Sequence, residues 1–240
     1  MHSMPKRRLS AVLAAALLSA GLLAGCSKDG GSKDTGNLPD AATLLQQSSE
    51  TTRGQQSVHL LLRTTGTQVQ DALPIERLEG DLTNVPQVAA QGNADLGGSF
   101  AGAKNLPFVV ADGNLYAAFN TGGQPKLVGP AAEIYDVSLI LNPDTGLANV
   151  LGSFTDPKSE GRDDVAGVKT VRVTGQVSAD AVNKIAPALG VTEPVPGTAW
   201  IREDGDHELV QAKLEPSSGN SIEMTTTEWG KPVTVTKPPA

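Results

Sequence analysis

Apolar and polar residues alternate along short runs over most of the chain after residue 57. In residues 58–64 and 77–83, every second side chain belongs to an apolar-rich face, which is the period of a half-buried strand. Turn signals such as Asp112-Gly113-Asn114 separate the runs, so the pattern predicts about nine or ten antiparallel strands in sequence order. The further runs are residues 88–96, 106–111, 115–119, 160–164, 169–177, 198–203, 208–215 and 221–229, and residues 233–236 are an optional addition as a last edge strand.

Two segments outside these runs show helix signals at their ends. Residues 41–53 follow a start signal at Asp40, and their apolar positions form a narrow stripe. Residues 181–186 lie between Ser178, a typical N-cap residue, and Pro187, which ends a helix. We expect one helix before the first strand and another in the last third of the chain.

The longest interruption of the strand pattern covers residues 129–154. The tetrapeptide 142–145, Asn-Pro-Asp-Thr, has the features of a helix start: an amide cap, a proline and an early carboxylate. The apolar positions after it recur at helical spacing, so one face is suited to burial. We expect a helical lid against the sheet, and an α+β fold. Those positions are Leu147, Val150, Leu151 and Phe154.

Small and medium side chains occupy the strand positions that should face inward. Aromatic residues make up only 3% of the chain. Since interiors pack densely and aromatic rings often fill a wide sheet, such a lining can leave an apolar hollow beneath the lid. Helices filling a flatter sheet are an equal alternative. The small inward residues are Gly80, Ala90, Gly92, Ala94, Gly175 and Ala212.

The first 25 residues have the pattern of an export signal. Basic residues at 6–8 precede an apolar run, 9–23, that is too short to span a membrane. Leu23-Ala24-Gly25-Cys26 resembles a bacterial lipobox, in which the cysteine is acylated and the signal is cut before it. A signal peptide with a chance cysteine is the alternative. Because Cys26 is the only cysteine, an internal disulfide is excluded.

We expect residues 26–38 to be a lipidated flexible tether, because 27–37 contain no large apolar side chain. Residues 39–240 then suit a single domain. The formal net charge is −7, and lysine and arginine are scattered through the mature sequence. This charge argues against nucleic acid or an anionic membrane surface as an electrostatic partner.

The sequence offers little for catalysis. Beyond the signal it has two histidines, His59 and His207, and it lacks HExxH, GxSxG and glycine-rich phosphate loops. Each histidine is more simply a surface residue, and Asp204-Gly205-Asp206 has too few carboxylates for a calcium loop. We therefore expect no catalytic residue, no metal and no cofactor. A weak lipase or acyltransferase is the enzyme alternative.

Several stretches resemble the mycobacterial LppX/LprAFG lipoproteins, and the likeness is closest to one branch of that family. It extends from the lipobox to the end of the chain, with residues 69–76 and 97–105 matching less well. The stretches are Pro-Ala-Ala-Glu-Ile-Tyr-Asp at 130–136, Leu-Asn-Pro-Asp-Thr-Gly-Leu-Ala-Asn-Val-Leu at 141–151, Glu-Gly-Arg-Asp at 160–163, Gly-Asp-His at 205–207 and Val-Thr-Val-Thr-Lys-Pro-Pro at 233–239.

This resemblance implies a strongly curved antiparallel half-barrel with helices on its concave face, enclosing an apolar cavity. It implies binding of triacylated lipids and glycolipids: phosphatidylinositol mannosides, lipomannan, lipoarabinomannan and triacylglycerol. A monomer anchored by lipid on the outer face of the cytoplasmic membrane, and partly secreted, would carry them toward the outer envelope, with a major-facilitator transporter as membrane partner. The alternative is a surface-presented interaction lipoprotein, serving a transporter or a host receptor, without a carrier role.

Such a carrier must bury nearly the whole length of each lipid tail. Each methylene contributes about 0.8 kcal/mol, so a sixteen-carbon chain represents about 12 kcal/mol that the protein has to match. For each candidate, plain core packing is the alternative to lipid contact. The candidate lipid-binding residues are Leu60, Leu62, Leu78, Leu82, Ala94, Leu96, Val171, Val173, Leu214, Ile222 and Met224 on strands, and Ile134, Leu139, Leu147, Val150 and Leu151 in the lid.

Overall fold

The computed structural model describes residues 36–239. The expected signal peptide, Cys26 and most of the expected tether lie outside these residues. No helix within the described part is both long and apolar enough to cross a membrane.

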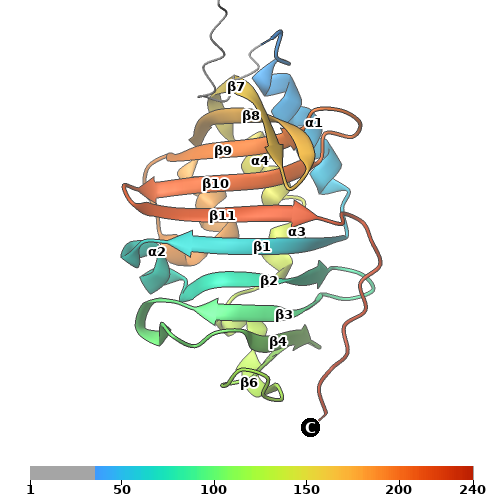
Figure 1. Cartoon of the computed structure of the whole chain (residues 1–240), viewed down its shortest axis with the longest axis vertical. Helices are drawn as coiled ribbons and strands as arrows, with labels where there is room; N and C mark the ends of the chain where they lie inside the picture. The colour runs from blue at the N-terminus through green and yellow to red at the C-terminus, as the bar shows by residue number, and fades with distance from the viewer. Residues whose placement is uncertain (1–35, 240) are drawn as a thin grey trace, which may run out of the picture. The chain divides into compact units, whose positions relative to one another are not determined.

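Eleven strands of the described residues form one antiparallel sheet (Figure 1). This confirms the α+β class, with one strand more than the upper expected number. The strands are β1 (Ser57–Thr65), β2 (Ile75–Thr83), β3 (Ala89–Leu96), β4 (Leu106–Ala111), β5 (Asn114–Ala117), β6 (Lys126–Pro130), β7 (Phe154–Val165), β8 (Val168–Val177), β9 (Val195–Arg202), β10 (Leu209–Ser217) and β11 (Asn220–Thr227).

The strand order is β6-β5-β4-β3-β2-β1-β11-β10-β9-β8-β7. The chain therefore builds one half of the sheet from the centre to an edge, crosses over, and returns from the other edge to the centre. The expectation of strands paired in sequence order is right within each half and wrong at the centre, where β1 pairs with β11. The sheet is not closed, since β6 and β7 form its two edges.

One expectation about the sheet edges is wrong, and one edge strand has no signal in the sequence. Residues 233–236 do not form a strand, and the C-terminal segment runs extended past the ends of the strands (Figure 1). The sheet instead ends at β6, whose Lys126, Leu127 and Val128 are all exposed. A strand with no buried face has no alternating pattern by which it could be recognised.

The two helices expected at the ends of the fold are confirmed. In α1 (Ala41–Arg53), the Asp40 carboxylate accepts a hydrogen bond of 2.9 Å from the backbone N–H of Thr43. In α5 (Ala179–Ile185), the Ser178 hydroxyl oxygen accepts one of 3.2 Å from the N–H of Ala181. Both side chains satisfy N–H groups that the first turn leaves unpaired. The connections between strands contain three further short elements. They are the helix α2 (Thr67–Ala72) and the 3₁₀ turns η1 (Gly98–Phe100) and η3 (Pro187–Leu189).

Residues 131–153, here called the crossover segment, connect β6 at one edge of the sheet to β7 at the other. They contain η2 (Ala131–Glu133), α3 (Ser138–Leu141) and α4 (Leu147–Gly152). Seen with the sheet toward the reader, α1, α3 and α4 lie behind it (Figure 1). The helical lid is therefore present as short pieces, and Phe154 belongs to β7 rather than to the lid.

The expected helix start at residues 142–145 is wrong. The Asn142 side-chain oxygen accepts hydrogen bonds from the N–H groups of Asp144 and Thr145, at 2.9 and 3.2 Å, which closes a turn. Helix α4 begins only after Gly146, whose N–H donates to the Asn142 carbonyl oxygen at 2.8 Å. Asparagine at such a place stabilises a local turn as readily as a helix end.

The core lies between one face of the sheet, called the inner face, and the helices α1, α4 and α5. Leu44 and Leu151 from two of these helices, and Val58 and Val173 from the sheet, belong to one buried cluster. The Ser49 hydroxyl donates a 2.7 Å hydrogen bond to the Ala148 carbonyl oxygen and so joins α1 to α4. The opposite face of the sheet, the outer face, carries charged and amide side chains such as His59, Glu79, Asp81, Gln91 and Asn93.

Candidate functional site

A continuous row of apolar side chains crosses the inner face of the sheet. Residues directly opposite each other on neighbouring strands share a face, so the strand register defines the row. It reaches from β4 to β8 and contains no polar residue. In order across the strands, its members are Leu106, Ala94, Leu78, Leu62, Met224, Ala212, Ala199 and Val173.

Burial along this row is uneven. Ala199 and Val173 at one end are fully buried, at 0% exposure, and Leu106 at the other end is 8% exposed. The five residues between them are only partly buried, although they face the helices. The helical layer therefore covers the middle of the inner face incompletely. Leu214 and Ile222, two residues further along β10 and β11 and on the same face, are partly buried as well.

The sixteen candidates from the sequence fall into three groups. Seven are fully buried in the core: Leu60, Leu82, Val171, Val173, Leu147, Val150 and Leu151. Eight are partly buried: Leu62, Leu78, Ala94, Leu96, Leu139, Leu214, Ile222 and Met224. Ile134, at the end of η2, is 59% exposed and takes no part in the buried cluster.

Three side chains of the inner face were missed because their strands lack a clear alternation. Phe108 and Leu115 pack against the core, and Leu106 ends the apolar row. Strand β4 is apolar at every position, so the period of two cannot tell its faces apart. The pairing of Phe108 with Gly92 reveals its face only once the register is known.

The small inward residues do not all border open space. A Cβ atom placed on Gly197 or Gly175 would lie 2.9 or 3.0 Å from the ring of Phe154, which already covers both glycines. A Cβ on Gly80 would lie 2.2 Å from the Gln91 carbonyl oxygen. Gly175 and Gly197 therefore make room for an aromatic ring, and Gly80 allows two strands to approach closely. At Gly80 and Gly175 the sequence predicted the lining of a hollow instead.

Two hollows stand out in the described part of the chain, and both are on the outer face. Neither is lined by any of the sixteen candidate residues. The apolar cavity that the resemblance implies is not one of these hollows. Leu141, Leu147, Val150 and Leu151 of the crossover segment belong to the same buried cluster as side chains of the inner face.

Tyr135 fastens the crossover segment to its neighbouring helix. Its phenol donates a 2.9 Å hydrogen bond to the carbonyl oxygen of Ile185, the last residue of α5. Burial of the phenol, with a smaller contribution from Asp136, raises the pKa of Tyr135 well above its ordinary value. The group is therefore a neutral hydrogen-bond donor at physiological pH.

No three metal-ligating side chains gather within residues 36–239 in a way that could hold an ion. The apolar row itself consists of leucine, alanine, methionine and valine side chains, which suit contact with hydrocarbon.

Comparison with known sequences gives a family match over nearly all of the described residues. The profile of the LppX_LprAFG lipoprotein family matches residues 40–235. A protein of Mycolicibacterium hassiacum named lipoarabinomannan carrier protein LprG is 60% identical over 97% of this chain and 99% of its own length. The LprG proteins of Mycolicibacterium smegmatis and Mycobacterium tuberculosis are 61% and 50% identical, each over 85% of this chain and over 85% and 84% of their own lengths.

Two solved structures share this fold. LprF from Mycobacterium bovis superimposes with a TM-score of 0.74 and 32% identity, covering 85% of this chain and 99% of that one. LppX from Mycobacterium tuberculosis gives a TM-score of 0.62 and 27% identity, covering 81% of this chain and 97% of that one.

Proposed function

This chain belongs to the LppX_LprAFG lipoprotein family, with LprG proteins among its relatives, and we propose that it carries acylated glycolipids on the inner face of its sheet. The observation that carries the proposal is the apolar row, whose middle keeps solvent-accessible surface beneath the helical layer. Aliphatic surface in that position is favourable for the tails of a lipid and for little else.

The tails enter by displacing the crossover segment. Leu147, Val150 and Leu151 belong to the same buried cluster as the strand residues of the inner face, so this face would become fully available only when α4 moves away. The helices of this segment span four and six residues, and isolated helices of such length have little stability of their own. Buried acyl chains then replace the side-chain contacts that the movement breaks, at about 0.8 kcal/mol for each methylene.

The lipid class follows from the relatives. Since several are named lipoarabinomannan carriers, we infer that the cargo includes lipoarabinomannan and its acylated relatives, lipomannan, phosphatidylinositol mannosides and triacylglycerol. Acylation at Cys26 would hold the protein on the outer face of the cytoplasmic membrane, and a secreted fraction would lack the anchor. The cargo would move as a complex with a monomer, from a major-facilitator transporter toward the outer envelope, without chemical change.

A docking role is supported by one separate observation. Phe119 between β5 and β6, Leu127 in β6 and Ile134 directly after η2 are 78%, 62% and 59% exposed. Exposed large apolar side chains that gather in one region mark interaction surfaces. The protein would meet a transporter or receptor there, in addition to carrying lipid or in place of it.

The proposal is tested by extracting a Cys26→Ala variant produced in a mycobacterial host. Organic extraction and mass spectrometry should recover acylated glycolipid in a near-stoichiometric amount. A matched preparation of Ala94→Trp in the same background should recover much less, because the indole occupies the middle of the row. Protein that is folded but free of lipid would contradict the carrier function and favour the docking role.

A further inference from the structure

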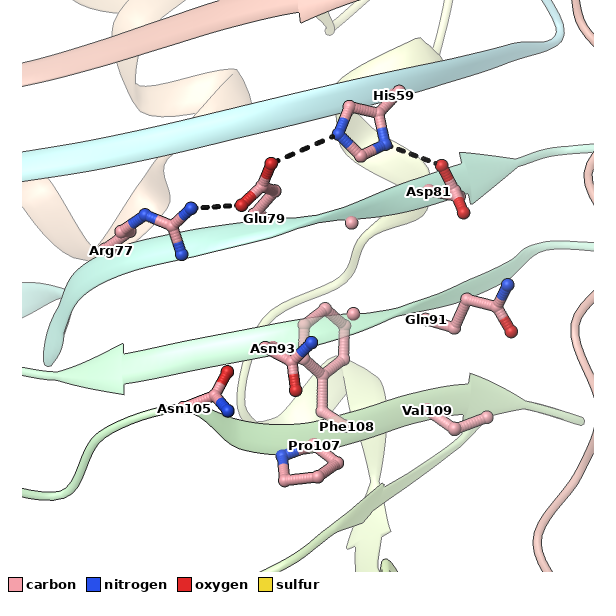
Figure 2. A pocket seen from close by; sticks show the side chains of 12 residues that line it. His59, Arg77, Glu79, Asp81, Gln91, Asn93, Asn105, Pro107, Phe108 and Val109 are labelled. Atoms are coloured by element: carbon pink, nitrogen blue, oxygen red, sulfur yellow. Dashed lines mark hydrogen bonds and ion pairs between the residues drawn. The ribbon is translucent and has the colours of Figure 1, made fainter. Parts of the chain in front are cut away.

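The outer face of the sheet contains a polar groove over β1, β2, β3 and β4 (Figure 2). Its main hollow has a volume of about 510 Å³. That volume lies within the range of about 300–1,000 Å³ typical of small-ligand pockets. A second hollow of about 320 Å³ shares His59, Asp81 and Gln91 with it, so the two form one groove.

One wall of the groove is a fixed chain of charged groups. The Arg77 guanidinium pairs with the Glu79 carboxylate, a Glu79 oxygen lies 3.6 Å from His59 Nε2, and His59 Nδ1 lies 2.7 Å from an Asp81 oxygen (Figure 2). The imidazole and the Asp81 side chain remain about one third exposed, at 32% and 33%. Their orientation is therefore set by the protein while their edges stay available to a ligand.

The opposite wall presents three carboxamides. Gln91 and Asn93 on β3 and Asn105 before β4 line the main hollow. Within residues 36–239, none of these three side chains makes a hydrogen bond to the protein. Each amide carries both donors and an acceptor, so the wall offers hydrogen-bonding groups of both kinds without a partner.

Apolar surface lies beside these amides. Pro107 and Val109 on β4 line the same hollow and share its side of the strand. A site with hydrogen-bonding groups on one side and a small apolar area on the other suits a sugar ring, whose hydroxyl groups lie at its rim and whose C–H groups form its faces.

The C-terminal segment closes the far end of the groove. Its residues 231–234 line the second hollow. The Ser57 hydroxyl donates a 2.6 Å hydrogen bond to the Lys231 carbonyl oxygen, and Lys237 lies 2.9 Å from an Asp112 oxygen. This hydrogen-bonded ion pair lowers the pKa of the Asp112 carboxyl. The segment is thus fastened by contacts to both Ser57 and Asp112.

The charges in the groove select among ligand classes. Glu79 and Asp81 would repel a phosphate group or a nucleic acid, and Arg77 would repel a cation. A neutral, polyhydroxylated ligand meets neither penalty, because hydroxyl groups donate to the carboxylates and amide oxygens and accept from the amide and guanidinium N–H groups.

We propose that this groove binds the neutral glycan portion of the glycolipid whose tails occupy the inner face. The proposal rests on the proposed function for the source of the glycan. His59 and Leu60 are neighbours in β1 and point to opposite faces, so the same strands would hold sugar on one side and hydrocarbon on the other. Such a second contact would favour lipids with long glycans over triacylglycerol, which has none.

The test compares the full chain in detergent micelles with a Gln91→Ala/Asn93→Ala double variant. Both side chains lie at the surface, and Gln176→Ala, an exposed amide on the outer face of β8, serves as the matched control. The probe is arabinomannan, the glycan without a lipid anchor, and its affinity is measured by titration calorimetry. We expect the double variant to bind at least tenfold more weakly and the control to bind within twofold of the unmodified protein.

Two further arms separate this proposal from the proposed function. Loading with radiolabelled triacylglycerol should be the same in all three proteins, and inorganic phosphate should not displace arabinomannan. Three results would overturn the groove proposal. They are the absence of glycan binding by the unmodified protein, glycan binding by the folded double variant that equals that of the unmodified protein, and loss of the binding in the presence of phosphate. Normal triacylglycerol loading in that case would leave the carrier function standing, whereas glycan binding without any lipid loading would support the groove and contradict the carrier.

Discussion

The phenol oxygen of Tyr135 lies 2.9 Å from the carbonyl oxygen of Ile185 and donates a hydrogen bond to it. This bond connects the crossover segment to α5, two parts of the layer that covers the inner face. In the proposed function the crossover segment moves for lipid to enter, so the bond between Tyr135 and Ile185 would oppose opening.

We expect Tyr135→Phe to weaken this cover while preserving the packing of the ring. The free energy of unfolding should fall by about 0.5–1.5 kcal/mol, the typical net contribution of one hydrogen bond. The release of a fluorescent lipid to acceptor vesicles should become faster. Urea unfolding and a release assay measure the two effects, and a lower stability with unchanged release would show that the crossover segment is not the moving part.

Tyr135 also predicts how stability depends on alkaline pH. Its pKa is raised in the folded protein, chiefly by burial, whereas the unfolded chain releases the proton near the ordinary value of 10.0. The contribution of the neutral Tyr135 to the free energy of unfolding is therefore fully present below pH 10. As the pH rises further, the free energy of unfolding falls, with a slope approaching about 1.4 kcal/mol per pH unit. Urea unfolding of the native protein and of Tyr135→Phe, at matched alkaline pH values, should show a shallower decline for the variant. Parallel declines would contradict this assignment.

Ala94→Trp tests whether the middle of the apolar row contacts lipid. Ala94 is partly buried and pairs with Leu78 and Leu106 on the neighbouring strands. At a lipid-contacting position, the variant should lose most of its bound lipid and keep its thermal midpoint. In a packed core, overpacking should instead cost about 1–3 kcal/mol.

Gln176→Trp supplies the control for that experiment. It places the same ring at an exposed position on the outer face of β8. Lipid extraction and thermal unfolding should both match the unmodified protein. A loss of lipid from this variant would mean that tryptophan substitution acts through something other than the apolar row.

Gly80 and Gly92 are expected to be required for the tight approach of β2 and β3. A Cβ on Gly80 would lie 2.2 Å from the Gln91 carbonyl oxygen, so Gly80→Ala should lower the free energy of unfolding by about 1–3 kcal/mol or more. Gly54→Ala is the control, since its Cβ would lie 3.6 Å from the Thr51 carbonyl oxygen, an ordinary contact, and its φ of −80° suits alanine. We expect a change below about 1 kcal/mol there. Equal effects in urea unfolding would contradict the distinction.

Local signals in the sequence were sufficient for most individual elements. The Asp40 cap and the Ser178 cap mark helices that the structure contains, and Asp112 and Gly113 adopt the positive φ angles, 52° and 73°, of the expected hairpin turn. Such features depend on a few neighbouring residues, so a short stretch of sequence is enough to predict them.

Relationships between distant strands could not be derived in this way. The pairing of Leu62 with Met224 brings β1 against β11, and no short window of sequence contains both. The same limitation applies to the groove, where His59 was interpreted as an ordinary surface residue. Its approach to Asp81, and the convergence of Gln91 and Asn105 nearby, depend on strand register.

The small residues on the inner face are the part of the fold that composition predicted wrongly, because they were expected to line a hollow. Gly80 and Gly92 signal a close approach of two strands, and Gly175 accommodates the ring of Phe154. A glycine in a strand can therefore indicate that other atoms lie close to its backbone, and not only that space is left empty. The resemblance to a lipoprotein family, and not the paucity of aromatic residues, was the dependable source for the fold.

The pairing of β1 with β11 also determines when this protein can fold. The first strand to be synthesised finds its central neighbour only after the last strand has been made. Contacts between such distant residues form slowly, since a long loop of chain must be closed first. A nascent chain of this topology can pair β1 to β6 early, but it cannot complete its sheet until translation is almost finished.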